Sequence, residues 1–172
     1  MSIRNMTRCA VFAGSMCLCA WIAVPVGDMS ITLQTLALFL SLGVLGGKLG
    51  TITSGVYLLL GAVGLPVFSG FRGGLGMLLG TTGGYLVGFL AAALVYWLAT
   101  ALFPKAVLPA MLLGQLVCYG LGTLWYGCVY LQGNLSGALL QCVLPYLIPD
   151  GVKIVTAWLL SKRLRITFPS GT

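Results

Sequence analysis

Long apolar runs with almost no charged residues dominate this sequence of 172 residues. Only 6% of the residues are charged, 59% are apolar, and histidine is absent. So few charges cannot cover a water-facing surface, which excludes a soluble globular protein. The runs predict an all-α integral membrane protein with a single membrane domain over residues 1–172. A transmembrane β-barrel would need short segments of alternating polarity, and we find none in this sequence.

The apolar runs divide into six expected transmembrane helices, which cover roughly residues 9–26, 31–47, 49–64, 77–103, 106–130 and 149–161. The positions of the charged residues support this count. If both termini are cytoplasmic, the cytoplasmic side carries Arg4, Arg8, Lys48, Lys105, Lys162, Arg163 and Arg165, and the outer side carries Asp28, Arg72, Asp150 and Lys153. Every cytoplasmic turn then obeys the positive-inside rule, and a shift by one span would break the pattern.

Two charged residues of the last span are expected to lie inside the membrane. Asp150 precedes Lys162, at the expected inner interface, by twelve residues, or about 18 Å of helix. The hydrocarbon core is about 30 Å thick, so Asp150 and Lys153 lie below the outer surface. Pro149 suits a first helical turn, so we expect the helix to begin there and the preceding residues to be non-helical. Charges at this depth favour a ligand cavity over a pair that only neutralises itself.

A glycine-rich stretch over residues 64–89 separates two of the apolar runs. We expect residues 64–76 to form an outer loop folded over the cavity, and residues 80–89 to form the turn into the fourth helix. Glycine lets the backbone bend and approach a ligand closely. The alternative is a loose connection whose arginine, Arg72, meets only lipid headgroups.

Several classes of function are excluded by missing residues. Without histidine, neither a Ser/His/Asp triad nor a common zinc site can form, and the six cysteines include no C-x-x-C pair. The closest approach to a P-loop is Gly47-Lys48, which is followed by leucine instead of serine or threonine. We therefore expect no enzyme activity, no metal and no cofactor. The dispersed basic residues also argue against nucleic acid binding.

Four segments carry a resemblance to a known family: ITLQTLAL at 31–38, GAVGLPVFSGFRGGLG at 61–76, GTTGGYLVGF at 80–89 and PDGVK at 149–153. With these segments the chain resembles the BioY family, the biotin-binding S components of energy-coupling-factor (ECF) vitamin transporters, over nearly its whole length. It departs at Thr81, where the family commonly has proline. The resemblance implies the six-helix S-component fold, cytoplasmic termini and a multi-pass protein of the bacterial cytoplasmic membrane.

The resemblance also implies partners. A transmembrane coupling (T) component and cytoplasmic ABC-type ATPases would supply the ATP hydrolysis that this chain cannot perform. Ala10 and Gly14 form a small-xxx-small pair, which allows close helix approach. In S components such a motif in the first helix contacts the T component, so the resemblance implies docking through these two residues.

Biotin chemistry fits the expected polar residues. Its ureido group has two N–H donors and one carbonyl, so Asp150 can accept, Lys153 can donate and Gln34 can do either. Arg72 can then bind the carboxylate tail bidentately, although the reverse orientation, with the tail at Lys153, stays open.

The remaining candidates would cover the ring of biotin. We expect Phe68 and Tyr85 to provide apolar and aromatic contacts, and Gly73 and Gly74 to bring loop backbone close to the ligand. From chemistry alone, Gln34 could instead be a helix-packing residue and Tyr85 an interfacial tyrosine.

Three other functions remain open at this point. The chain could be an S component for another vitamin, a self-sufficient carrier such as a proton-coupled one, or an assembly subunit that transports nothing. Binding of biotin by the purified chain would separate the first and third from the favoured function.

Overall fold

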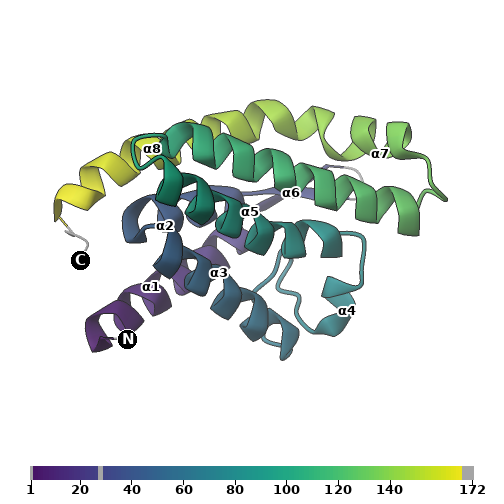
Figure 1. Cartoon of the computed structure of the whole chain (residues 1–172). Coiled ribbons are helices and arrows are strands. Elements are labelled where there is room, and N and C mark those ends of the chain that lie inside the picture. The colour runs from purple at the N-terminus through teal and green to yellow at the C-terminus, as the bar shows by residue number, and fades with distance from the viewer. Residues whose placement is uncertain (1, 27–28, 168–172) are drawn as a thin grey trace.

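The computed structural model describes residues 2–26 and 29–167 and is mostly helical (Figure 1). Asp28, expected on the outer side, lies outside the described residues. The elements are α1 (Ile3–Trp21), β1 (Ala23–Val26), β2 (Met29–Thr32), α2 (Gln34–Leu45), α3 (Gly47–Ala62), α4 (Leu75–Leu78), α5 (Gly83–Leu102), α6 (Val107–Val129), α7 (Leu135–Cys142), the 3₁₀ helix η1 (Leu144–Tyr146) and α8 (Leu147–Thr167).

The long helices run between two ends of the molecule. The start of α1 and the end of α8 lie at one end, and α4 and α7 lie at the other (Figure 1). Within the described part of the chain, three helical segments are long and apolar enough to cross a membrane: Gly83–Leu102, Val107–Val129 and the continuous stretch Leu135–Arg165. The helix α2 is apolar but shorter.

The connection between the first two long helices differs from the expectation. Here β1 and β2 form an antiparallel pair in which Ala23 lies opposite Thr32. The first helix therefore ends at Trp21, and the second begins at Gln34, three residues later than the expected Ile31. The reason is local, because Val24, Ile31 and Thr32 are β-branched residues that favour extended backbone.

The start of the fourth long helix was also placed too early. The chain forms the short α4 and then turns, so that α5 begins at Gly83 instead of near Met77. A Cβ at Gly83 would lie 1.9 Å from the carbonyl oxygen of Leu78, so this tight return requires glycine. The indole of Trp125 donates to the carbonyl of Gly80 at 3.0 Å, which satisfies a backbone acceptor in the turn.

The expectation that the residues before Pro149 are non-helical is wrong. They form α7 and η1, and α8 begins at Leu147. The side chain of Asn134 caps α7 by accepting from the amide of Gly137 at 2.9 Å. Pro145 lies in the first turn of η1, where its missing N–H costs no helical hydrogen bond.

Close helix packing sets the positions of α6 and α8. The helices α5 and α6 approach each other through glycines: a Cβ at Gly84 would lie 2.3 Å from Trp125, and one at Gly122 would lie 2.3 Å from the ring of Tyr85. The helix α8 packs along α2, where Gly43 lies against Ser161. This packing brings the first turn of α8 beside the middle of α6.

Candidate functional site

A cavity of about 600 Å³ lies between the loops and helices that surround Asp150 and Lys153. Its volume is within the range of about 300–1,000 Å³ that is common for small-molecule sites. Its wall comes from the hairpin, the start of α2, the glycine-rich loop, and helices α5, α6 and α8. Six of the residues proposed from the sequence line it: Gln34, Phe68, Arg72, Tyr85, Asp150 and Lys153.

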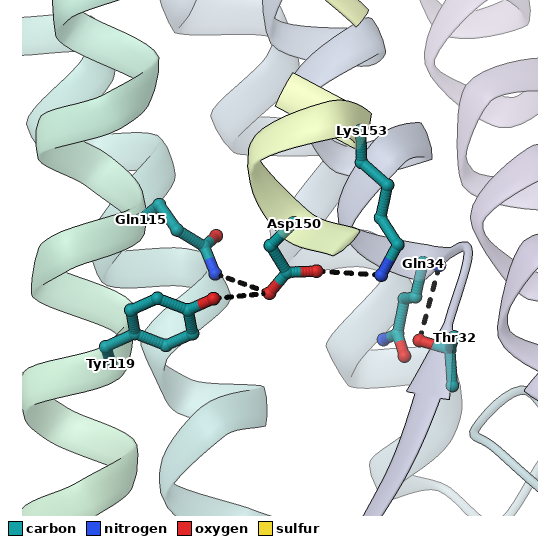
Figure 2. A network of polar contacts seen from close by, with 6 residues as sticks. All are labelled: Thr32, Gln34, Gln115, Tyr119, Asp150 and Lys153. Carbon is teal, nitrogen blue, oxygen red and sulfur yellow. Dashed lines mark hydrogen bonds and ion pairs between the residues drawn. The ribbon is translucent and has the colours of Figure 1, made fainter. Parts of the chain in front are cut away.

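The carboxylate of Asp150 is the centre of a buried polar network (Figure 2). One oxygen, Oδ1, accepts from Lys153 Nζ at 2.7 Å. The other oxygen, Oδ2, accepts from Tyr119 OH at 2.7 Å and from Gln115 Nε2 at 2.9 Å. Asp150 is 5% exposed and Lys153 7% exposed. Each charge is therefore paired and hydrogen-bonded, as burial in an apolar environment requires.

Two members of this network, Gln115 and Tyr119, were missed from the sequence. They lie four residues apart on α6, so both face the first turn of α8. An amide in the middle of an apolar span is a usable signal, because polar groups there require partners. The Oε1 atom of Gln115 is buried and has no hydrogen-bond partner among the described residues.

The side chain of Gln34 connects the cavity wall to α3. Its Nε2 donates to Tyr57 OH at 2.8 Å, and Tyr57 OH donates to the carbonyl of Val67 at 2.9 Å. Tyr57 is fully buried. Tyr57 engages one of the two amide N–H groups of Gln34, so the amide oxygen and the second N–H group remain available to a ligand.

The glycine-rich loop forms one wall of the cavity. Phe68 is buried, and its ring meets Tyr57 edge-on at a centroid distance of 5.6 Å. Its amide donates to the carbonyl of Arg72 at 2.9 Å, so the loop returns on itself and places the exposed Arg72 on the cavity wall. The loop thus carries an apolar contact and a cation on the same cavity wall.

Gly73 and Gly74, which were expected to contact the ligand, are not among the described residues that line the cavity. A Cβ at Gly73 would lie 2.1 Å from the carbonyl oxygen of Leu65. Gly74 has φ of +95°, and its amide donates to the carbonyl of Gly61 at 2.7 Å. The structure therefore gives these glycines a role in the path of the loop.

Tyr85 lies on the cavity wall at the start of α5. Its hydroxyl is 3.4 Å from both Thr123 Oγ1 and the carbonyl oxygen of Cys142, so it links α5 to α6 and α7. Its ring packs on Gly122. The aromatic face and the hydroxyl are thus held in one orientation beside the polar network.

Ala10 and Gly14, the proposed docking residues, are both exposed on α1. Apart from the adjoining backbone of α1, no described atom lies within 4 Å of the position that a Cβ would take at Gly14. The two residues form a shallow face that another helix could approach closely.

Comparisons with known proteins agree with the fold and with the sequence motifs. Residues 1–170 match the BioY family. The chain is 37% identical to the biotin transporter BioY of Thermotoga maritima, over 95% of this chain and 96% of that one. It is 35% identical to the probable biotin transporter BioY of Pyrococcus horikoshii, over 96% and 98% of the two chains.

A solved structure shares the fold. The crystal structure of the S-component for biotin from an ECF-type ABC transporter superposes with a TM-score of 0.88 at 25% sequence identity, covering 95% of this chain and 92% of that one. The motifs, the arrangement of helices and the match along nearly the whole sequence together show that this chain belongs to the BioY family.

Proposed function

We propose that this chain binds biotin in the cavity beside Asp150 and delivers it across the membrane as the S component of an ECF transporter. The observation that carries the proposal is the buried Asp150–Lys153 pair, which opens onto a cavity of ligand size. Such a pair is costly inside a membrane protein, and a polar ligand would use the hydrogen-bonding capacity that it retains. The names of the relatives and of the matching structure support biotin as that ligand.

The free donors and acceptors of the site match the ureido group. An ammonium group has three donors, and Lys153 uses one of them on Asp150, which leaves two for the ureido carbonyl. A carboxylate has about four acceptor positions, of which Asp150 uses three. The remaining position and the oxygen of Gln34 can accept the two ureido N–H groups. Phe68 and Tyr85 then flank the apolar ring.

The same proposal includes the arrangement in the membrane. The chain is a multi-pass membrane protein, and we place α1, α2, α3, α5, α6 and α8 as six spans of the cytoplasmic membrane with both termini inside. In Figure 1 the start of α1 and the end of α8 lie at the same end of the molecule, which supports an even number of spans. The exposed Ala10 and Gly14 would dock to a T component, and partner ATPases would supply the energy.

Calorimetry on the purified chain tests the function. We expect biotin to bind with micromolar affinity or tighter, and thiamine not to bind, because thiamine has no ureido group to satisfy Asp150 and Lys153. Desthiobiotin, which keeps the ureido group and the tail, should bind more weakly than biotin but measurably. Binding of thiamine in preference to biotin would contradict the proposal, as would a failure to bind any of the three.

Arg72 is expected to recognise the carboxylate tail. Replacing Arg72 with alanine should weaken biotin binding by about tenfold or more, because a charge-assisted bidentate contact contributes about 1.5–3 kcal/mol. Biotin methyl ester lacks the charge and should lose much less affinity. Equal losses for the two ligands, measured by the same calorimetry, would exclude the carboxylate role and favour the reverse orientation with the tail at Lys153.

A further inference from the structure

The glycine-rich loop is held from two sides, and the two attachments differ in strength. On the inner side, the buried Phe68 packs on Tyr57 and against Gly61, and Tyr57 OH donates to the carbonyl of Val67. Fully buried contacts of this kind open rarely.

The outer side of the loop is held by the last residue of α1. The indole N–H of Trp21 donates to the carbonyl of Pro66 at 2.8 Å. Its ring stacks on Phe71 with a centroid distance of 4.7 Å and an interplanar angle of 27°. Phe71 is 63% exposed, so this attachment is one hydrogen bond and one stacked pair at the rim. It is the weaker of the two attachments and the one that can release without disturbing the core.

The backbone at Phe71 is itself unfavourable. Phe71 has φ of +57° and follows Gly70, which has φ of +72°. A residue with a Cβ rarely adopts this left-handed conformation, so its presence requires a compensating contact. The structure shows two such contacts, the stack of Phe71 on Trp21 and the backbone hydrogen bond from Phe68 to Arg72 that closes the turn.

The same short segment forms the wall of the cavity. Phe68, Ser69, Gly70 and Arg72 all line it, whereas the side chain of Phe71 points to Trp21 instead. Movement of residues 69–72 away from α1 would therefore carry Ser69, Gly70 and Arg72 with it, while Phe68 stays anchored on Tyr57.

We propose that Trp21 and Phe71 form a latch that keeps residues 69–72 closed over the cavity and thereby sets the rate at which ligand leaves. Trp21 is in this sense a positioning residue, since it acts on the ligand through the loop. The inference rests on the proposed function for the identity of the ligand, biotin, but the state of the loop can be measured without ligand.

The first test measures the dissociation of labelled biotin from the purified chain after a chase with excess unlabelled biotin. Trp21→Ala should raise the dissociation rate roughly tenfold, because both the stacked pair and the hydrogen bond are lost. Trp21→Phe keeps a stacking ring without the donor and should have an intermediate rate. Ile22→Ala removes a neighbouring side chain that is 57% exposed and should leave the rate unchanged.

The second test measures amide hydrogen exchange in the ligand-free chain. Trp21→Ala and Phe71→Ala should each speed exchange in the peptide covering residues 64–74, where the amides of Phe68 and Gly74 are hydrogen-bonded. Exchange in α5 and α6 should stay as in the wild type. A general loss of stability would instead speed exchange in these helices as well. If hydrogen exchange of the loop is unchanged in both variants, the proposal that Trp21 and Phe71 hold the loop is wrong, whether or not the chain binds biotin. If Trp21→Ala binds biotin with normal affinity and an unchanged dissociation rate, the latch proposal is also wrong, while the proposed function still holds.

Discussion

Replacing Asp150 with asparagine should weaken biotin binding by roughly 30- to 1,000-fold, the equivalent of about 2–4 kcal/mol. The carboxylate accepts from Lys153, Tyr119 and Gln115 and retains one position for the ligand. An asparagine side chain carries two donors of its own and cannot satisfy three donors and a ureido N–H together. Calorimetry of the purified variant measures the loss.

The same change should also lower stability, and a second variant separates the two effects. Asp150→Asn leaves the buried ammonium of Lys153 without its counter-ion, and breaking a buried pair costs about 3–5 kcal/mol. Asp150→Asn combined with Lys153→Met removes both charges and should recover most of the lost melting temperature. It should not recover biotin binding. Wild-type affinity in the folded double variant would exclude this pair as the ligand site.

Replacing Gly73 with alanine should distort the loop and destabilise it by about 1–3 kcal/mol, the usual cost of overpacking. The new Cβ would lie 2.1 Å from the carbonyl oxygen of Leu65, which is backbone and cannot move aside as a flexible side chain can. Biotin binding should weaken strongly, because Phe68 and Arg72 are carried by the same loop.

A nearby glycine provides the control for this prediction. Apart from the adjoining backbone of α4, no described atom lies within 4 Å of a Cβ built at Gly76, so Gly76→Ala should leave binding and melting temperature nearly unchanged. Both variants are measured by thermal unfolding and by biotin titration. If Gly73→Ala binds like the wild type, the proposed dependence of the site on this loop path is wrong.

The sequence predicted the helical character of the chain, and it placed the bounds of α2, α3 and α6 to within about three residues. Apart from the first helix and the hairpin that follows it, the sequence placed two features wrongly, the start of α5 and the residues before Pro149. Both errors concern segments where an apolar run can continue a helix or fold back. The choice was made by contacts with distant residues, such as the indole of Trp125 on the carbonyl of Gly80.

The residues of the candidate site also divide into those that the sequence could identify and those that depend on tertiary contacts. Asp150, Lys153 and Gln34 could be chosen because a polar side chain in an apolar run stands out without any knowledge of its neighbours. Gln115 and Tyr119 were missed, since their importance depends on facing Asp150 across a helix pair. The glycines at 73 and 74 were assigned to the ligand because their freedom is visible in the sequence, whereas the backbone atoms that require it are not.

The membrane class, the family and the buried charged pair were thus determined by the sequence by itself, because hydrophobicity and charge are properties of single residues and short runs. Only the tertiary structure decided which side chains donate hydrogen bonds to the carboxylate of Asp150. It also decided that Trp21 contacts the glycine-rich loop. Those contacts join positions that are 31 to 45 residues apart, such as Tyr119 with Asp150 and Trp21 with Pro66. They exist only after close packing has brought the helices and loops together, and no local pattern specifies that packing.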